Sequence, residues 1–185
     1  MPKRNTLLRA GLVAASLLLV VACTGSNSVK GSMGRLDVQM TDTPIDMTNV
    51  ASVVVTISDV EVFGGTEGTT MDDGMPIVVS THPATFDLLT LTGGATTLLA
   101  SGEVPTGFYN RIRLDISSAT LTYKDGTTAD LKIDSNKVDV PIGFQVTASG
   151  GGSVVLDFNA AASVQVNDTS GGTLVLRPVV TPKQS

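Results

Sequence analysis

The feature of this sequence that most constrains its fold is an alternation of apolar and polar residues with a period of two. In residues 35–42, Leu36, Val38 and Met40 point to one side of an extended chain, and the polar residues between them point to the other. The alternation returns in residues 53–57, and no uninterrupted stretch long enough for a helix repeats apolar residues at helical spacing. Valine and threonine are the commonest residue types, with 24 residues each, and both favour strands. The sequence therefore predicts an all-β protein whose strands turn one face toward a core.

The apolar positions change phase in two places, which predicts two β-bulges. After Ile57 the apolar set moves from odd to even positions, so an extra residue is expected near residues 58–59. Between Ile116 and Ala119 the set moves back from even to odd positions. A second bulge near residues 117–118 would let this long stretch bend from one sheet to the other.

The turn at residues 124–126 tests the register of one hairpin. A two-residue Asp-Gly loop would set Leu121 opposite Asp130, whereas a three-residue loop with a left-handed Gly126 sets Leu121 opposite Ala129. The second register keeps the apolar residues on one face, so we expect the three-residue loop.

Further strands are expected between glycine-rich turns, and two short helical turns are expected in residues 42–49 and 96–100. Pro178 lies late in the last strand, which suits a sheet edge or a strand end. About eight to ten short strands separated by glycine turns predict an antiparallel β-sandwich that follows an N-terminal signal helix. The additional strands are expected at residues 76–80, 85–91, 138–142, 153–158, 163–166 and 173–179.

The N-terminus has the three parts of an export signal. Residues 1–22 begin with three basic residues, continue into the apolar run 10–22 and end on a small residue. The run is shorter than the roughly 20 residues that cross a bilayer. Residues 20–23, VVAC, resemble the lipobox of bacterial lipoproteins, in which the cysteine thiol is diacylglycerylated before cleavage. The alternatives for Cys23 are a soluble secreted protein that is cleaved nearby and an uncleaved anchor.

Lipidation would divide the chain into four parts: the signal peptide 1–22, a lipidated Cys23 with a Gly/Ser-rich tether to residue 34, the sandwich 35–180 and a C-terminal tail 181–185. Two or three acyl chains, palmitate among them, anchor a protein durably, because each buried methylene contributes about 0.8 kcal/mol. The tether would reach roughly 20 Å, so the domain would float just off the membrane.

Thr24 bears on the destination of the lipoprotein. It follows the cysteine at the position where many proteobacteria read Asp as a retention signal. By that resemblance the expected location is the outer membrane, or the cell surface if the host has a single membrane.

Charge and cysteine content exclude several classes of partner and cofactor. Residues 1–22 hold three of the 12 Lys and Arg and no acid, so the remaining chain carries nine basic and 17 acidic residues, a net charge of −8. Nucleic acid and anionic lipid head groups are therefore poor partners. A single cysteine allows neither an intramolecular disulfide nor a cysteine zinc site.

Six segments spaced along the chain carry a resemblance to a known family. In chain order they read LDVQMTDTPID, VVVTISDVEV, TFDLLTL, GFYNRIRLDI, VVLDFNAAASV and LVLRPVV. They resemble the bacterial and archaeal lipoproteins of domain of unknown function 4382, over roughly residues 34–180. The resemblance implies no established activity and a transthyretin-like (prealbumin-like) sandwich. The alternative for the fold of the sandwich is an immunoglobulin-like Greek key. Asn159 departs from the family pattern, which tends to carry an acid there.

The sequence offers little catalytic chemistry. The only histidine, His82, precedes a proline in a loop, and the chain has no Gly-x-Ser-x-Gly elbow and no lysine-bearing phosphate loop. A glycosidase needs only two carboxylates at set distances, and some pair among 17 acids meets that condition by chance. We therefore expect no enzyme and no catalytic residue.

Three acids are weak candidates for a hard cation: Asp42, Asp46 and Asp157. Ca²⁺ needs six to eight oxygen ligands, and no calcium-loop spacing is present. The alternative for Asp42 is structural, since an Asp before Thr-Pro accepts backbone N–H bonds in its own turn. We expect no cofactor, with Ca²⁺ as the alternative.

Tyr109, Arg111, Arg113 and Asp115 alternate along one expected strand and form a candidate ligand-binding face. Such a face could hold an acidic sugar or a carboxylate-bearing partner, such as envelope polysaccharide or another envelope protein. The structural alternative is that acids on neighbouring strands pair with the two arginines. Within the resemblance, the phenol of Tyr109 would tie down a neighbouring loop.

These observations predict a lipid-anchored cell-envelope lipoprotein that acts as a non-catalytic binding or structural module. The runner-up is a calcium- or glycan-dependent recognition domain at the cell surface, and an envelope hydrolase comes third.

Overall fold

The computed structural model of the protein describes residues 32–42, 47–64, 75–167 and 173–183. All of them belong to one unit, Gly31–Ser185. None of the described helices is long and apolar enough to cross a bilayer. Cys23 and Asp46, two of the candidate site residues, lie outside the described residues.

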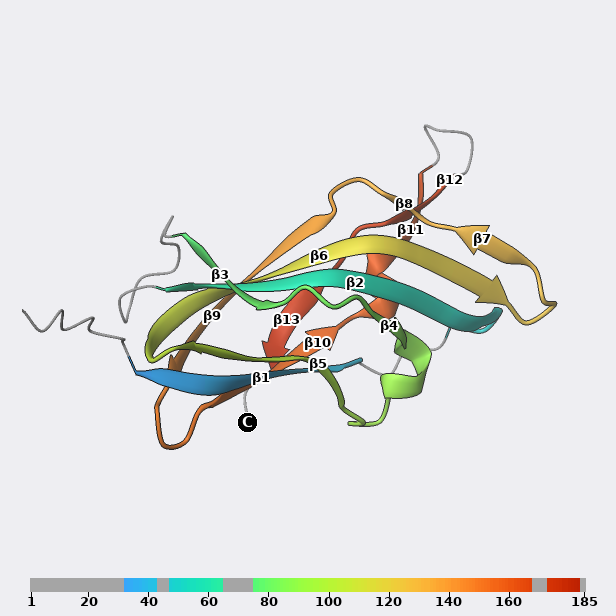
Figure 1. The fold of residues 1–185 in the computed structure, drawn as a ribbon. Helices are drawn as coiled ribbons and strands as arrows, with labels where there is room; N and C mark the ends of the chain where they lie inside the picture. Colours follow the sequence, from blue (N-terminus) through green and yellow to red (C-terminus); the bar gives the residue numbers. More distant parts are fainter. Residues whose placement is uncertain (1–31, 43–46, 65–74, 168–172, 184–185) are drawn as a thin grey trace, which may run out of the picture. The chain divides into compact units, whose positions relative to one another are not determined.

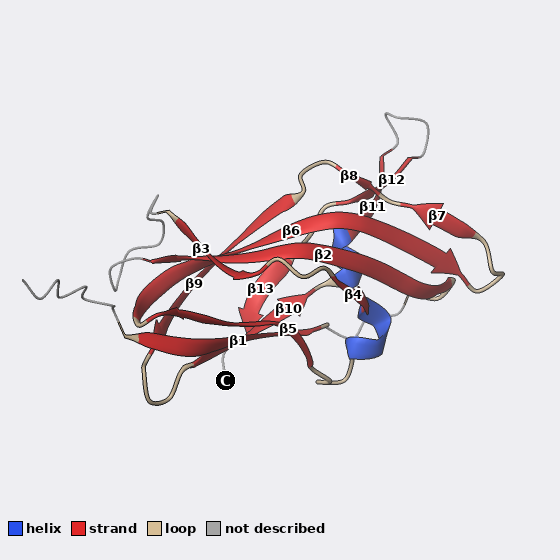
Figure 2. Cartoon of the chain, in the orientation of Figure 1, coloured by secondary structure: helices blue, strands red, loops and turns tan. Residues whose placement is uncertain are grey.

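Two β-sheets packed through a shared core form the body of this unit (Figures 1 and 2). The first sheet has the strand order β13 (Val180–Lys183), β10 (Gly152–Phe158), β1 (Met33–Thr41) and β5 (Thr97–Pro105). The second has the order β3 (Pro76–Ser80), β2 (Val50–Gly64), β6 (Gly107–Tyr123) and β7 (Thr128–Asp130), with β4 (Ala84–Asp87) paired to β2 and β9 (Lys137–Val146) paired to β6. A smaller sheet joins β11 (Val164–Asn167), β12 (Thr173–Leu176) and β8 (Lys132–Ile133).

The core lies between the inner faces of the two large sheets. Each inner face is the apolar set of an alternating strand: Leu36, Val38 and Met40 of β1 are fully buried, and Val53 and Val55 of β2 meet them from the other sheet. Burying one such side chain stabilises the fold by about 1.5–3 kcal/mol. The predicted all-β sandwich is confirmed. It is not wholly antiparallel, because β1 pairs with β10, and β12 with β8, in parallel.

Both predicted bulges lie where β2 and β6 pair, and they compensate each other. Thr56 is opposite Ser118 and Ile57 is opposite Ile116, so β6 has one extra residue, Ser117. Asp59 is opposite Asp115, so β2 has its own extra residue one step later. The two changes of phase therefore occur together, and the core faces stay aligned. The expectation that this stretch crosses between sheets is wrong, because β6 stays in one sheet along its whole length.

The hairpin between β6 and β7 has the predicted register. Leu121 is opposite Ala129, and the N–H of Leu131 donates to the carbonyl of Ala119. Gly126 has φ of +88°, in the left-handed region that a three-residue loop requires at this position.

Three local expectations are wrong. Residues 88–91 form a 3₁₀ helix, η1 (Leu88–Leu91), rather than the end of a strand, and Asp87 caps it by accepting a hydrogen bond from the N–H of Leu89. The expected helical turn at residues 96–100 is instead the start of β5. A short helix that the pattern did not predict, α1 (Ala160–Ser163), follows β10. Of the other expected helical turn, residues 43–46 lie outside the described residues.

The ends of the domain extend further than expected. β1 begins at Met33, within the expected tether, and Pro178 lies between the end of β12 at Leu176 and the start of β13 at Val180 rather than inside one last strand. The chain then continues as β13, which pairs with β10 as far as Lys183 opposite Val155. Residues 181–183 therefore belong to the sandwich rather than to a tail.

The two long sides of the sandwich differ. On one side β3 and β5 approach closely, because Gly102 of β5 has no side chain: a Cβ there would lie 2.4 Å from the carbonyl oxygen of Val79. On the other side β9 and β13 lie beside each other, and no hydrogen-bonded ladder joins them in the described part of the chain. Among the described residues no ladder joins β3 and β5 either, so the difference between the sides is the close approach at Gly102 on the first and a groove on the second, which leaves the second side open.

Candidate functional site

A groove with a volume of about 700 Å³ occupies the open side of the sandwich, between β9, β10 and β13. Ile142 and Phe144 of β9 line it and pack against the core, and the buried Val154 of β10 lines it from the opposite sheet. The floor of the groove is therefore a continuation of the core. Small-molecule sites in proteins have volumes of roughly 300–1,000 Å³ and mostly apolar walls. We take this groove as the candidate binding site.

Proline stands in both edge strands beside the groove, Pro141 in β9 and Pro182 in β13. Proline has no backbone N–H, so it weakens a sheet edge as a template for another strand. Pro182 pairs with Leu156 of β10, which leaves the other side of β13 toward the groove. The groove is therefore suited to contacts through side chains more than to the addition of a strand.

Phe144 is held in place by Tyr109 of β6. Their ring centroids are 5.3 Å apart with an interplanar angle of 16°. The phenol of Tyr109 donates a 2.6 Å hydrogen bond to the carbonyl oxygen of Pro105 and ties the β5–β6 turn to the core, as the resemblance implies. Tyr109 is 2% exposed, and burial raises the pKa of its phenol. Tyr109 therefore supports the wall of the groove from behind.

The prediction that Tyr109 lies on the same exposed face as Arg111, Arg113 and Asp115 is wrong, because Tyr109 is buried. Asn110 is an extra residue where β6 pairs with β2, since Gly64 is opposite Tyr109 and Phe63 is opposite Arg111. This bulge turns Tyr109 into the core, while Arg111 and Arg113 stay on the outer face of the sheet.

Arg111 and Arg113 are paired with an acid of the neighbouring strand, as the structural alternative expected. Arg113 donates two hydrogen bonds to Asp139 of β9, from Nε to Oδ1 at 2.6 Å and from Nη2 to Oδ2 at 2.9 Å. Nη1 of Arg111 lies 3.9 Å from Oδ2 of the same carboxylate. The hydrogen bonds from Arg113 lower the pKa of Asp139, and in return Asp139 raises the pKa of Arg113.

Phe63 of β2 lies under both guanidinium groups. The Cζ atom of Arg111 is 3.8 Å, and that of Arg113 4.8 Å, from the centroid of its ring. Cation–π contacts of this kind stabilise a pair by about 0.5–2 kcal/mol, depending on desolvation. Both arginines are thus engaged within the domain, which favours a structural role for this face.

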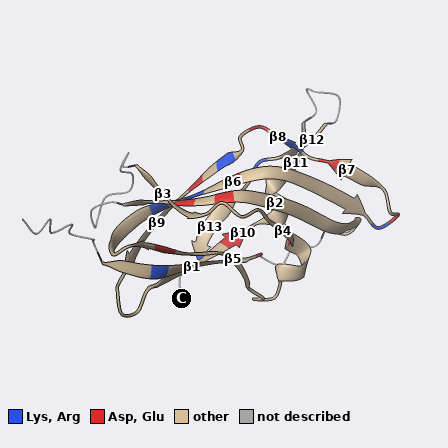
Figure 3. Cartoon of the chain, in the orientation of Figure 1, with Lys and Arg blue, Asp and Glu red and all other residues tan. Residues whose placement is uncertain are grey.

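Asp115, the fourth residue of the candidate face, lies between Asp59 of β2 and Lys137 of β9 in the register of the sheet. Figure 3 shows how acidic and basic residues are distributed over the strands. Like charges opposite each other repel, and a lysine on the other side offsets that repulsion. The arrangement is a row of two acids and one lysine across three strands.

Asp42 has a structural partner far along the chain. It is 2% exposed, and its Oδ1 accepts a 3.0 Å hydrogen bond from the N–H of Ala160, the first residue of α1. Asp42 thereby links β1 to the segment after β10, and the turn that it was expected to serve, residues 43–46, lies outside the described residues. Asp157, the other described candidate, lies opposite Thr41 of β1 and Thr181 of β13.

Asn159 is the N-cap of α1. Its side-chain oxygen accepts a 2.9 Å hydrogen bond from the N–H of Ala162. Asn and Asp are both favoured at this position, so an acid here would also act as a cap. Within the described residues, no three His, Cys, Asp or Glu side chains lie close enough together to hold a metal ion. His82 is exposed between β3 and β4.

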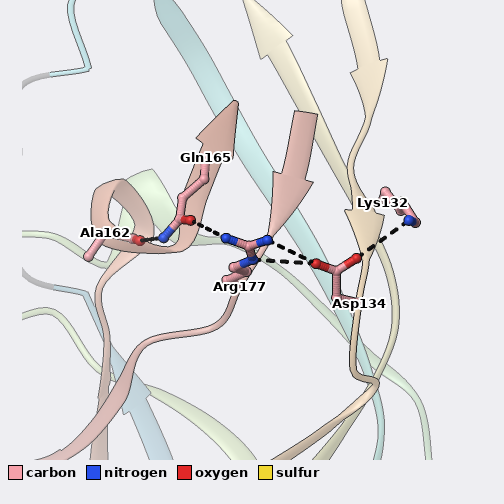
Figure 4. Close-up of polar contacts among 5 residues, drawn as sticks. All are labelled: Lys132, Asp134, Ala162, Gln165 and Arg177. Carbon is pink, nitrogen blue, oxygen red and sulfur yellow. Dashed lines mark hydrogen bonds and ion pairs between the residues drawn. The ribbon is translucent and has the colours of Figure 1, made fainter. Parts of the chain in front are cut away.

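A polar network that the sequence analysis missed joins the small sheet to α1 (Figure 4). Nε and Nη2 of Arg177 each donate to Oδ2 of Asp134 at 3.3 Å, and Nη1 donates to Oε1 of Gln165 at 3.1 Å. Gln165 donates onward to the carbonyl of Ala162, and Lys132 lies 3.6 Å from Asp134. The two charged pairs are exposed, so each contributes little to stability.

A comparison with models of protein families shows to which family the chain belongs. The family model described as Domain of unknown function (DUF4382) matches residues 33–178. The chain belongs to the DUF4382 family. No match is found among curated proteins or among solved structures.

The DUF4382 segments noted in the sequence build most of the core but only part of the groove, to which they contribute Val154 and Val155 of β10. They fall in β1, β2, β4 with η1, β6, β10 to β11, and β12 to the start of β13. Strand β9 and the end of β13 lie outside them, so Phe144, Ile142 and Lys183 were missed as candidate site residues. One signal was available: Val138, Val140, Ile142, Phe144 and Val146 continue the alternation past the expected end of this strand.

Proposed function

We propose that this DUF4382 protein is a lipid-anchored lipoprotein of the cell envelope, and that its folded domain is a non-catalytic binding module. The anchor is supported by residues 20–23, which match a lipobox, and by the basic and apolar segments before them. The first strand begins at Met33, ten residues after Cys23. A thiol-linked diacylglycerol at Cys23 would therefore hold the sandwich close to a membrane surface.

The groove on the open side of the sandwich is the observation that carries the binding part of the proposal. It is about 700 Å³ in volume, and its floor exposes side chains that belong to the core. The arginine face supports binding less well, because Asp139 already accepts two hydrogen bonds from Arg113. We therefore assign recognition to the groove and a structural role to the arginines.

The location follows from the residue after the cysteine. Thr24 takes the place of the Asp retention signal, so we propose the outer membrane as the destination in a host with two membranes. In a host with one membrane, the domain would stand on the outer cell surface.

Metabolic labelling tests the anchor. Cells that produce the wild type or Cys23→Ser are grown with a clickable fatty acid, and the membranes are separated from the soluble fraction. We expect label and membrane association in the wild type and the loss of both in Cys23→Ser. Equal labelling of the two proteins, or none in the wild type, would contradict the proposal.

A further inference from the structure

We propose that the groove between β9, β10 and β13 binds a single-chain amphiphile with a carboxylate head group, of the fatty-acid class. This inference rests on the proposed role of the groove as the binding site of the domain. Three observations support it: the apolar residues in the groove wall, the charge of Lys183, and the prolines in the two bordering strands.

The apolar part of the groove wall suits an aliphatic chain, whereas Ser153 and Lys183 belong to its polar part. Phe144 and Ile142 are partly buried, Val154 is 4% exposed, and all three also contact the core. Pro182 completes the apolar lining from the opposite strand edge. A chain laid over the partly buried Phe144 and Ile142 would remove their exposed parts and itself from water, and removal of apolar surface from water is the main source of affinity in apolar sites.

The charge of the groove selects the head group. Among the described residues that line it, Lys183 alone is charged, and its side chain is exposed in the last described strand. Elsewhere acids outnumber bases, so this ammonium group is the feature that favours an anion here. A carboxylate paired with Lys183 would orient an amphiphile, with its apolar tail directed toward Phe144.

The size and edges of the groove argue against other occupants. A volume of about 700 Å³ falls in the range of a single small molecule rather than a two-chain phospholipid. Pro141 and Pro182 each remove an N–H from the bordering strands, so an added peptide strand would lack part of its ladder.

Photo-crosslinking tests the proposal on the full chain. The wild-type protein is reconstituted in phospholipid nanodiscs and illuminated with a palmitic acid that carries a diazirine and a terminal alkyne. Mass spectrometry of the digest locates the cross-link. We expect it in the peptides that contain residues 141–144 or 153–155, with unlabelled palmitate as an effective competitor and hexadecanol as a poor one.

Charge reversal supplies the matched comparison. Lys183→Glu should lower the labelling about fivefold, because an exposed pairing is replaced by a repulsion. Lys124→Glu, at an exposed lysine in the β6–β7 turn, should leave the labelling unchanged. Both sites are on the surface, so neither variant should impair folding.

Four results would overturn the proposal: no labelling of the groove peptides, equal loss in the two lysine variants, equal competition by hexadecanol, or a dimer in light scattering whose formation abolishes the labelling of the groove peptides. The last would assign the groove to a second copy of the chain. The mass of the Cys23 peptide in the same digest reports lipidation separately. Failure of the anchor and failure of the ligand assignment are thus distinguishable.

Discussion

The ring of Tyr109 stacks on that of Phe144, with 5.3 Å between their centroids, and so joins the β5–β6 turn to the wall of the groove. Tyr109→Phe keeps the stack and removes the hydrogen bond to the carbonyl of Pro105. We expect the free energy of unfolding to fall by about 1 kcal/mol, the usual contribution of one such bond. Urea denaturation followed by circular dichroism measures it. Tyr123→Phe, at the other tyrosine of the chain, is the control, and an equal loss in both variants would contradict this role.

Asp139→Asn should destabilise the protein at neutral pH and not in acid. The hydrogen bonds from Arg113 lower the pKa of the folded carboxyl. Its contribution is therefore present above the unfolded pKa of about 3.9 and is lost as the pH falls through the folded pKa. The side chain is 34% exposed, so after solvent screening we expect roughly 0.5–1 kcal/mol at pH 7.

Urea denaturation of the wild type and Asp139→Asn at several pH values measures that difference. Asp130→Asn, on the exposed strand β7, is the comparison, because Asp130 accepts a hydrogen bond only from the hydroxyl of Thr120 among the described contacts. A gap between wild type and Asp139→Asn that persists unchanged at pH 2 would show that the ion pair is not its source.

Asp42→Ala should cost about 1–3 kcal/mol, because the buried N–H of Ala160 would lose its acceptor. Asp42→Asn keeps an oxygen in place and should cost less. If the role of Asp42 is structural, the loss is the same in millimolar calcium and in EDTA. A loss that appears only in calcium would instead indicate a cation site.

Gly126→Ala should destabilise the β6–β7 hairpin by about 1–2 kcal/mol, because alanine is strained at φ of +88°. Gly64→Ala is the control: a Cβ there meets nothing within 4 Å, and its φ is not in the left-handed region. Thermal unfolding of both variants compares the two sites. Equal stability of the two variants would contradict the three-residue loop.

The parts of the fold that could be predicted are those that leave a local pattern. The changes of phase at Ile57 and Ile116 are visible in the sequence because each strand is buried on one face only. The hairpin register followed from the same principle, since only one loop length kept Leu121 opposite an apolar residue.

The wrong predictions have two physical causes: strands with bulges and contacts between residues far apart in the sequence. The start of β5 was mistaken for a helical turn because Leu99 is an extra residue between Leu98 and Ala100 and interrupts the alternation. Tyr109 was placed on the wrong face for the same reason, a bulge at Asn110. The bond from Ala160 to Asp42 joins residues 118 apart, and no local pattern indicates it.

The candidate site was only partly visible for a related reason. The groove forms where the edges of the two sheets stay apart. These edges are β9 and β13, which are distant in the sequence, so no local pattern indicates the space between them. The sequence pointed to charged residues on an alternating strand, and the two arginines among them are paired with Asp139 of the neighbouring strand. The apolar residues of the groove resemble core residues until the open edge is known.

The mass of the mature N-terminus tests the central claim most directly. The protein is isolated from its native envelope, digested and analysed by mass spectrometry. The account predicts that Cys23 is the first residue and that its thiol carries a diacylglycerol. An unmodified Cys23, or a mature terminus at any other residue, would contradict it.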